Sequence, residues 1–381
     1  MRIAHLSLKD YRNYRAAEVD FVAGPNLIVG RNGQGKTNMV EAVGYLATLG
    51  SHRVATDAPL IRSGEDAAII RARLQSGERE LLAELQINRS GQNRAQLNRG
   101  QVRPRELVRY CHSVLFAPED LALVRGDPAG RRRYLDELLV QRTPRLASVM
   151  ADYERVLKQR NSLLKSARAS GVKPSAMSTL DIWDERLVAL GTEIIDERLA
   201  LVEQLRAPLV SAYQSVAGDD HVPRLVPLLS IDDMTDDDSP LERPSESIAS
   251  TAERFRDAIA SRRRQELERA VTLVGPHRDD LLLMLNALPA KGYASHGESW
   301  SYALALKLAS AQLLRHDFAS GDPVLVLDDV FAELDLARRQ RLAEAVHGYE
   351  QVLITAAVFE DVPETLAKHL VRIENGEVMD A

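Results

Sequence analysis

The sequence predicts an α/β fold in which both ends of the chain build one sheet domain and a mainly helical domain is inserted between them. Short apolar runs of Leu, Ile and Val at 27–29 and 324–327 have the composition of buried parallel strands. Between them, residues 127–215 carry apolar side chains at spacings of three and four, which is typical of amphipathic helices. We therefore expect a sheet domain from 1–120 and 271–381, with 121–270 inserted.

The composition is that of an ordinary folded protein. Its 381 residues, 45% hydrophobic and 27% charged, allow two or three domains with a substantial core. The one cysteine, Cys111, cannot form an internal disulfide, and we expect it in the core. The sequence contains neither an apolar run of about 18 residues nor a leader-like start. We expect a cytoplasmic protein with no membrane partner.

The formal net charge of −6 would by itself argue against a nucleic-acid partner, but the charge is distributed unevenly. Residues 86–168 contain 17 Lys and Arg against 8 Asp and Glu, whereas 219–246 contain 9 acidic and 2 basic residues. The basic segment predicts salt-sensitive contacts to a nucleic-acid backbone, with weak dependence on base sequence. The average over the chain therefore does not exclude DNA.

The elements follow in order from local patterns. Strands are predicted in the first 30 residues, then a helix over 37–49, and then alternating strands at 66–90 and 92–103 with hairpin turns at Gly77 and Gly91. The inserted region is expected to contain long helices joined by a loop at 171–178.

An acidic, Pro-rich connection is expected at 218–247, with one strand near 225–231, followed by a helix over 251–268. Strands are expected to return from Val271, and the Asn-Gly pair at 375–376 predicts a terminal hairpin.

A glycine-rich turn between the first apolar run and the first helix fits the pattern G-x-x-x-x-G-K-[ST]. Glycines at such a turn let backbone N–H groups face a phosphate, and the helix N-terminus adds a positive dipole. Lys36 is expected to reach the β- and γ-phosphates of ATP, and the Thr37 hydroxyl to bind Mg²⁺. The predicted nucleotide-binding residues here are Gly30, Arg31, Asn32, Gly33, Gln34, Gly35, Lys36 and Thr37.

The strand at 324–327 ends in two carboxylates that complete this site. We expect Asp328 to bind the metal together with Thr37, and Asp329 to orient or activate the attacking water. Lys36, Asp328 and Asp329 are thus the catalytic candidates. The two motifs lie 291 residues apart, whereas small P-loop kinases and GTPases place them much closer.

A third motif, at 295–299, opens the helical run at 300–314. Its Ser-x-Gly-Glu turn at a helix N-terminus is an anion site, although in isolation such a turn is about as often an ordinary helix cap. Its place shortly before Asp328 favours the anion-binding interpretation. Ser295, Gly297 and Glu298 are therefore nucleotide-binding candidates.

Further segments are spread over the whole chain, namely 10–14 (DYRNY), 51–53 (SHR), 116–120 (FAPED), 130–136 (GRRRYLD), 275–280 (GPHRDD) and 331–335 (FAELD). With the three motifs, they resemble the ABC-type P-loop ATPase head, and more narrowly the chromosome-maintenance-like RecF family of recombination mediators. In such heads the third motif, the signature turn, caps the γ-phosphate held by the P-loop of a second subunit.

The resemblance implies ATP-driven homodimerisation on single- and double-stranded DNA, at gaps and junctions, in recombinational repair and replication-fork maintenance. It also implies that recombinase is loaded together with RecO and RecR. Arg12 is expected to contact the nucleotide, and Arg131, Arg132 and Arg133 to contact the DNA backbone. DNA-dependent ATP hydrolysis should be weak, because 354–356 lacks the switch histidine of transporters and Asp329 replaces their catalytic glutamate.

Three alternatives remain open. A transporter ATPase subunit predicts the switch histidine and a much shorter insertion, and a chromosome-maintenance protein predicts hundreds of heptad residues in place of roughly 150. A nucleotide sensor without turnover would carry the same motifs.

Glu119 or Asp120 is expected to replace the glutamine that ABC heads place near the metal. His277 is expected to have a structural or coupling role.

Overall fold

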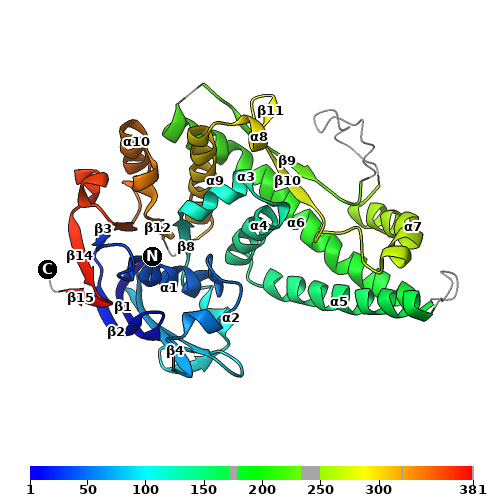
Figure 1. The fold of residues 1–381 in the computed structure, drawn as a ribbon, viewed down its shortest axis with the longest axis horizontal. Coiled ribbons are helices and arrows are strands. Elements are labelled where there is room, and N and C mark those ends of the chain that lie inside the picture. Colours follow the sequence, from blue (N-terminus) through cyan, green and yellow to red (C-terminus); the bar gives the residue numbers. More distant parts are fainter. Residues whose placement is uncertain (171–177, 219, 233–248, 319–320, 380–381) are drawn as a thin grey trace. The chain divides into compact units, whose positions relative to one another are not determined.

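The computed structural model describes residues 1–170, 178–218, 220–232, 249–318 and 321–379 (Figure 1). Its contacts divide the chain into two compact units, one of 1–125, 207–223 and 292–381, and the other of 126–206 and 224–291. This division differs from the expected one, because 207–223 pack with the first unit and 271–291 with the second. The expected loop at 171–177 and the acidic run at 233–238 lie outside the described residues.

The first unit contains a six-stranded antiparallel sheet in the order β2-β1-β4-β5-β6-β7. Its strands are β1 (Arg2–Tyr11), β2 (Tyr14–Asp20), β4 (Ala67–Ser76), β5 (Arg79–Asn88), β6 (Arg94–Leu97) and β7 (Gly100–Val102). Alternating apolar side chains, such as Ile70, Ala72 and Leu74 of β4, bury one face of the sheet. The hairpin turns predicted at Gly77 and Gly91 are confirmed.

A second six-stranded sheet, in the order β15-β14-β3-β13-β12-β8, carries the apolar runs. Its strands are β3 (Gly24–Val29), β8 (Ser113–Phe116), β12 (Val324–Asp328), β13 (Gln351–Ala356), β14 (His369–Glu374) and β15 (Glu377–Met379). Strand β3 pairs in parallel with both β13 and β14, which confirms that the two ends of the chain build one head. The Gln351 side chain also bonds to both backbone groups of Ile3, each at 2.8 Å.

The helices of the first unit are α1 (Lys36–Thr48), α2 (Pro104–Leu107), α3 (Leu121–Arg125), α9 (His296–Asp317) and α10 (Leu336–Val346), with the part of α6 (Ser178–Ala217) from residue 207 on. Cys111 is buried, as expected. The Asn-Gly turn between β14 and β15 is also confirmed, with φ of 52° at Asn375 and 77° at Gly376. None of the described helices has the length and apolarity needed to cross a bilayer.

The second unit combines helices with a small sheet. It contains α4 (Pro128–Arg142), α5 (Leu146–Ser170), α6 up to residue 206, α7 (Thr251–Arg269) and the strands β9 (Pro223–Leu228), β10 (Asp280–Leu285) and β11 (Leu288–Pro289), with α8 (Ala290–Tyr293) at its boundary. The expectation that strands resume at Val271 is wrong, because β10 begins only at Asp280. The preceding turn is held by Ser230, whose hydroxyl accepts from Gly275 N at 2.8 Å and whose N–H donates to Asp279 Oδ1 at 2.8 Å.

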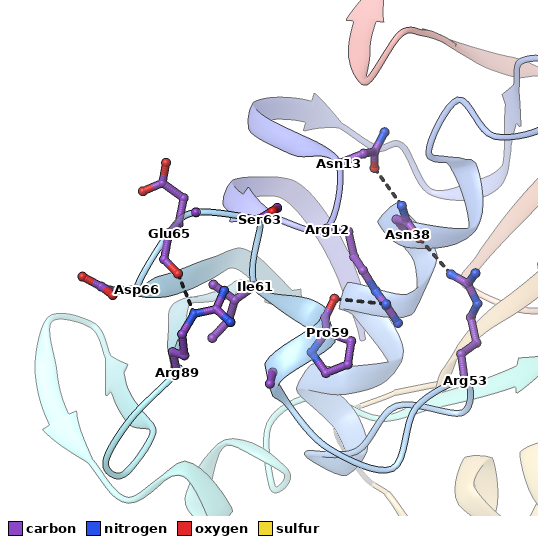
Figure 2. Close-up of a pocket in the computed structure, with 12 residues that line it drawn as sticks. Arg12, Asn13, Asn38, Arg53, Pro59, Ile61, Ser63, Glu65, Asp66 and Arg89 are labelled. Carbon is purple, nitrogen blue, oxygen red and sulfur yellow. Dashed lines mark hydrogen bonds between the residues drawn. The ribbon is translucent and has the colours of Figure 1, made fainter.

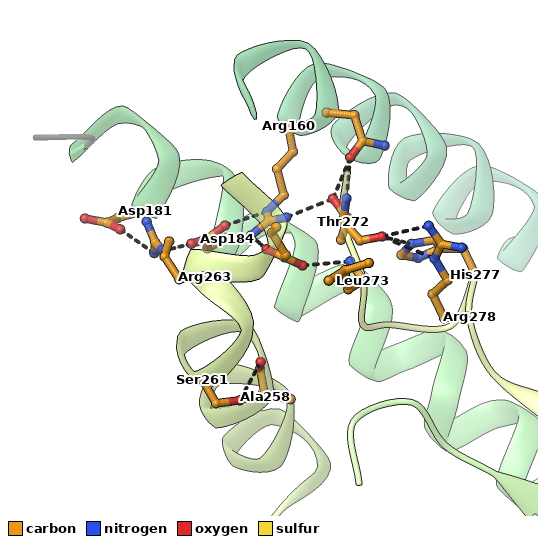
Figure 3. Close-up of polar contacts among 12 residues, drawn as sticks. Arg160, Asp181, Asp184, Ala258, Ser261, Arg263, Thr272, Leu273, His277 and Arg278 are labelled. Carbon is orange, nitrogen blue, oxygen red and sulfur yellow. Dashed lines mark hydrogen bonds and ion pairs between the residues drawn. The ribbon is translucent and has the colours of Figure 1, made fainter. Parts of the chain in front are cut away.

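A buried ionic cluster joins the helices of the second unit (Figure 3). The fully buried Arg160 of α5 donates to Asp184 of α6 at 2.7 Å and to Glu266 of α7 at 2.6 Å. It also donates to the Thr272 hydroxyl at 2.8 Å. Loss of one partner would leave a buried charge uncompensated, so the cluster fixes how these helices pack.

Candidate functional site

The P-loop connects β3 to α1 and is held in shape from outside. Gly35 adopts φ 119°, and a Cβ there would come within 2.7 Å of the side chains of Asn13 and Tyr14. Those side chains donate to the carbonyls of Gln34 and Gly35 at 3.0 and 2.9 Å. A residue larger than glycine cannot occupy this place without displacing the loop. Helix α1 follows at once with no side-chain cap, so its first N–H groups remain free for an anion.

The side chains of Thr37 and Asp328 are in contact, although 291 residues separate them in the sequence. Thr37 Oγ1 donates to Asp328 Oδ1 at 3.1 Å, and Thr355 Oγ1 donates to the same oxygen at 2.6 Å. Thr355 also accepts from the backbone N–H of Asp329 at 2.9 Å. The parallel pairing of β12 with β13 places these groups at the carboxyl edge of the sheet, next to the P-loop.

Asp328 is only 3% exposed. The pKa of Asp328 is raised to about 6, mainly by burial and also by the negative charges of Asp329 and Glu119, while the hydrogen bonds from the two threonines lower it in part. A buried carboxylate beside a hydroxyl fits a hard divalent cation, which would restore the ionised form. The described residues contain no cluster of three His, Cys, Asp or Glu, so Mg²⁺ would complete its shell with water and phosphate oxygens.

Glu119 and Asp120 differ in their partners. Asp120 is engaged away from the metal site, since its Oδ2 accepts from Ala117 N at 2.8 Å and its Oδ1 pairs with Lys307 at 2.9 Å. Glu119 is close enough to raise the pKa values of both Asp328 and His52. The geometry therefore favours Glu119 as the acidic group next to the metal site.

Arg12 lines a polar pocket of about 680 Å³ beside the P-loop (Figure 2). Two further arginines, Arg53 and Arg89, line the same pocket. The Arg12 guanidinium is held in place by Glu41 of α1, with Nε–Oε2 and Nη2–Oε1 distances of 2.8 and 2.6 Å, and by the Pro59 carbonyl at 3.1 Å.

Arg12 belongs to a series of polar contacts that runs from Arg12 round to its chain neighbour Asn13 and that sequence reasoning did not predict. We call this set the polar ring; it comprises Arg12, Asn13, Asn38, Glu41, Ser51 and Arg53. Asn13 accepts from Asn38 at 2.7 Å, Asn38 accepts from Arg53 at 2.8 Å, and the backbone N–H of Arg53 donates to Ser51 Oγ at 3.0 Å. Figure 2 shows the chain of contacts from Asn13 to Arg53.

Glu41 closes the ring by accepting from Ser51 Oγ at 2.5 Å. Its side chain is fully buried, and burial alone would raise the pKa of Glu41. The hydrogen bonds from Arg12 and Ser51 outweigh this effect and hold the pKa below its ordinary value. Because Asn13 also donates to Gln34, the ring joins the pocket wall to the P-loop.

The signature turn begins α9. Ser295 is the N-cap and forms a reciprocal capping box with Glu298, whose carboxylate accepts from Ser295 N at 2.7 Å. These bonds hold the pKa of Glu298 below its ordinary value, and His221 lies 2.8 Å from the same carboxylate. A Cβ at Gly297 would come within 3.0 Å of the Arg338 guanidinium. Among the described residues, no hydrogen bond or ion pair joins this turn to its own P-loop.

The three arginines expected to contact DNA lie in the second unit, in α4. Arg131 is only 6% exposed and forms a bidentate pair with Asp280 at 2.7 and 2.9 Å, so it is not available to a phosphate. Arg132 donates to the Asp279 carbonyl at 2.7 Å, and Arg133 is exposed and pairs with Glu137. The expectation of a three-arginine DNA contact is therefore not retained.

His277 is also engaged structurally. It lies 2.7 Å from the Tyr153 hydroxyl, and burial lowers the pKa of His277 to about 4. Arg278 donates to the carbonyl of Thr272 at 3.1 Å. The motif at 275–280 thus has a structural role in the second unit. Its high content of turn-forming and polar residues could have indicated this role from the sequence.

Comparison with known proteins agrees with this geometry. The family model for the RecF/RecN/SMC N terminal domain matches residues 2–377. The chain is 63% identical over 384 residues to the DNA replication and repair protein RecF of Leifsonia xyli subsp. xyli, covering 100% of both. It is 53% identical over 386 residues to the RecF protein of Streptomyces avermitilis, covering 99% of both.

Solved structures support the same assignment. The structure of the recombination mediator protein RecF with ATP in the RecFOR pathway has a TM-score of 0.88 at 26% identity, over 100% of this chain and 97% of that chain. An Smc head bound to the C-winged helix domain of ScpA has a TM-score of 0.54 at 15% identity, covers 99% of this chain and 96% of that chain, and shows the fold alone. On this evidence the chain has the ABC-type head fold and belongs to the RecF family of DNA replication and repair proteins.

Proposed function

We propose that this chain is an ATP-dependent DNA-binding protein of recombinational repair and replication-fork maintenance, in which ATP joins two heads on DNA. The observation that carries the proposal is the contact between Thr37 and Asp328, which brings the two halves of a nucleotide and metal site together across 291 residues. The relatives support it, since they are DNA replication and repair proteins and a recombination mediator solved with ATP.

Each part of the site has a role in this proposal. Backbone N–H groups of the P-loop and of the first turn of α1 cradle the phosphates, and the buried Lys36 neutralises them. Thr37 and Asp328 hold Mg²⁺, which supplies charge stabilisation at the transferred phosphoryl group. Asp329 orients the attacking water, and the pocket lined by Arg12 and Arg53 receives the nucleoside end.

The signature turn acts on a second copy of the chain. Ser295, Gly297 and Glu298 form a preorganised helix N-terminus whose polar contacts among the described residues do not include its own P-loop. Such a turn can accept the γ-phosphate of another head, so that ATP lies between two protomers. Hydrolysis is slow, because residues 354–356 contain no histidine and Thr355 bonds to Asp328. The family membership supports its dependence on DNA.

The DNA substrate is gapped or junction DNA, and the partners in recombinase loading are RecO and RecR. This part of the proposal is supported by the family membership and by the solved relative's place in the RecFOR pathway. The uneven charge along the chain, with its basic segment at 86–168, supports contacts to the DNA backbone.

Sedimentation of the full chain tests the proposal. With ATP and Mg²⁺ the protein should sediment as a dimer, and gapped DNA should shift the dimer to a faster species. ADP should leave it monomeric. A monomer with ATP at high concentration, both with and without DNA, would contradict the proposal.

A further inference from the structure

We propose that the hairpin β6–β7, together with the residue that follows it, is a DNA-backbone-binding surface formed by Arg94, Arg99 and Arg103. The inference rests on the proposed function and names the surface that would carry its DNA contact. This surface takes the place of the three α4 arginines that the sequence had suggested as the DNA contact, of which Arg131 is buried and ion-paired.

The three arginines lie at one end of the antiparallel sheet. Ala95 of β6 pairs with Val102 of β7, and Ala95 is buried. The neighbouring positions, Arg94 and Arg103, are both exposed and project on the outward side of the pair, because side chains alternate along a strand. Arg99 is exposed at the tip of the same hairpin. Strand β7 is the edge of the sheet, so this end is open.

Their charges have no partner among the residues that the structure describes. On the same sheet, Arg71 of β4 pairs with Glu84, and Arg73 lies 3.9 Å from Glu80. By contrast, the guanidinium groups of Arg94, Arg99 and Arg103 form no hydrogen bond or ion pair with any residue that the structure describes. Three unpaired guanidinium groups on one short hairpin make a local positive field suited to a row of phosphates.

The backbone of Arg99 is an independent observation. The turn has two central residues with positive φ, Asn98 at 50° and Arg99 at 68°. The second position of such a turn favours glycine, since a Cβ is strained there. Asn98 suits its place and binds back to Leu82, with N–H and side-chain bonds of 2.8 Å. An arginine kept where glycine would be more stable indicates a role for its side chain outside the fold.

Protection of a sheet edge is the competing explanation for these charges. Charged side chains at an edge strand prevent pairing with another sheet. That explanation predicts that removal of the arginines causes self-association without loss of DNA binding by the monomer. The two explanations therefore give opposite results in one pair of measurements.

The test compares two double variants of the full chain. Arg94→Gln with Arg103→Gln removes two arginines from the surface. Arg15→Gln with Arg372→Gln is the matched control, because these arginines are exposed, belong to the same unit and form no ion pair with a described residue. Binding to a fluorescein-labelled duplex with a central gap is followed by anisotropy at salt concentrations from about 50 to 200 mM.

The surface variant should bind about tenfold more weakly near the middle of this range. The slope of its log K against log salt should fall by about two, because each missing arginine leaves one phosphate with its counterions. The control should change affinity less than about twofold and keep the slope. An unchanged slope in the surface variant, an equally weakened control, or self-association in sedimentation with unchanged monomer binding would each overturn the proposal. If the wild-type protein does not bind the gapped duplex, the proposed function itself fails.

A single variant separates binding from folding. Arg99→Gly relieves the strained backbone, so its melting temperature should equal or exceed that of the wild type, while its DNA affinity falls and its salt slope decreases by about one. Unchanged DNA affinity in this variant would remove Arg99 from the surface. Because stability and binding are expected to move in opposite directions, misfolding cannot produce the expected result.

Discussion

Lys36 shows at the scale of one residue how the site is prepared for an anion. Its side chain is buried, with 3% exposed, and its one polar contact among the described residues is to the Arg31 carbonyl at 3.5 Å. A buried ammonium group without a carboxylate is costly unless a counter-charge enters the site. The residue therefore contributes to phosphate binding more than to the stability of the free protein.

Lys36→Ala should weaken ATP binding about 10- to 100-fold, the value of a charged hydrogen bond, without lowering the melting temperature of the free protein. Titration with a fluorescent ATP analogue measures the first quantity, and thermal melting the second. Lys9→Ala, at an exposed lysine of β1, is the control and should change neither. ATP affinity that Lys36→Ala leaves intact would contradict the P-loop assignment.

Glu41 has the opposite character, because it is a buried charge whose partners are all supplied by the protein. Glu41→Gln should lower the free energy of unfolding by about 3 kcal/mol, since Arg12 would keep its charge and lose its carboxylate. ATP affinity should fall as well, because the pocket wall and the P-loop are joined through the polar ring.

The matched control is Ser51→Ala, which removes the hydroxyl's hydrogen bond to Glu41 and those it accepts from the backbone N–H groups of Arg53 and Val54, and keeps the ion pair with Arg12. It should cost less than Glu41→Gln, because no ionised group loses its charged partner. Denaturant melts and ATP titrations of both variants measure the effect. Equal effects of the two substitutions would show that the carboxylate charge has no special role.

At the scale of elements, sequence patterns predicted the helices, strands and turns that depend on residues close together in the chain. The strand before the P-loop, helix α1 and the hairpin at Asn375–Gly376 follow from residues adjacent in sequence. The polar ring could not be predicted, because its contacts join a turn after β1, the middle of α1 and the segment after it. The turns at 271–279 were mistaken for strand because Ser230, more than 40 residues earlier, holds them.

Helix α9 presents its N-terminus through Ser295, so a substitution there tests contact between two heads. Ser295→Arg should leave ATP binding intact and abolish ATP-induced dimers, because a bulky side chain would stand where the phosphate of another protomer is proposed to lie. Ser295→Ala is the control, since it loses the same cap at a cost of about 1 kcal/mol without adding bulk. Sedimentation with ATP distinguishes them, and normal dimers of Ser295→Arg would exclude the trans role of this turn.

For the whole molecule, the net charge of −6 is less informative than its distribution. The basic segment could be counted from the sequence, but which of its arginines are free could not. Arg131 pairs with Asp280 at a separation of 149 residues, and only the fold brings them together. The register of the β6–β7 hairpin places Arg94 and Arg103 on the exposed side of the strand pair. Sequence thus predicts the kind of partner, and the fold selects the surface.

Three buried or half-buried histidines, distributed over the two units, make the stability of the chain sensitive to acid. Burial lowers the pKa values of His52, His112 and His277 from 6.5 to about 4. In the unfolded chain these histidines bind protons below about pH 6.5, whereas in the folded chain they bind them only near pH 4. Stability is fully present above the unfolded pKa and is lost as the pH falls, by up to about 3 kcal/mol for each histidine.

The melting temperature should accordingly fall from pH 6.5 toward pH 4, and His112→Phe should make this fall shallower. The His112 ring stacks on Phe318 with centroids 3.7 Å apart, so a phenyl ring can keep the packing while it removes the titrating group. Melting curves of both proteins across this range measure the difference, with Lys9→Ala as a surface control. A pH profile of His112→Phe that parallels the wild type would mean that His112 is protonated as readily in the folded chain as in the unfolded one.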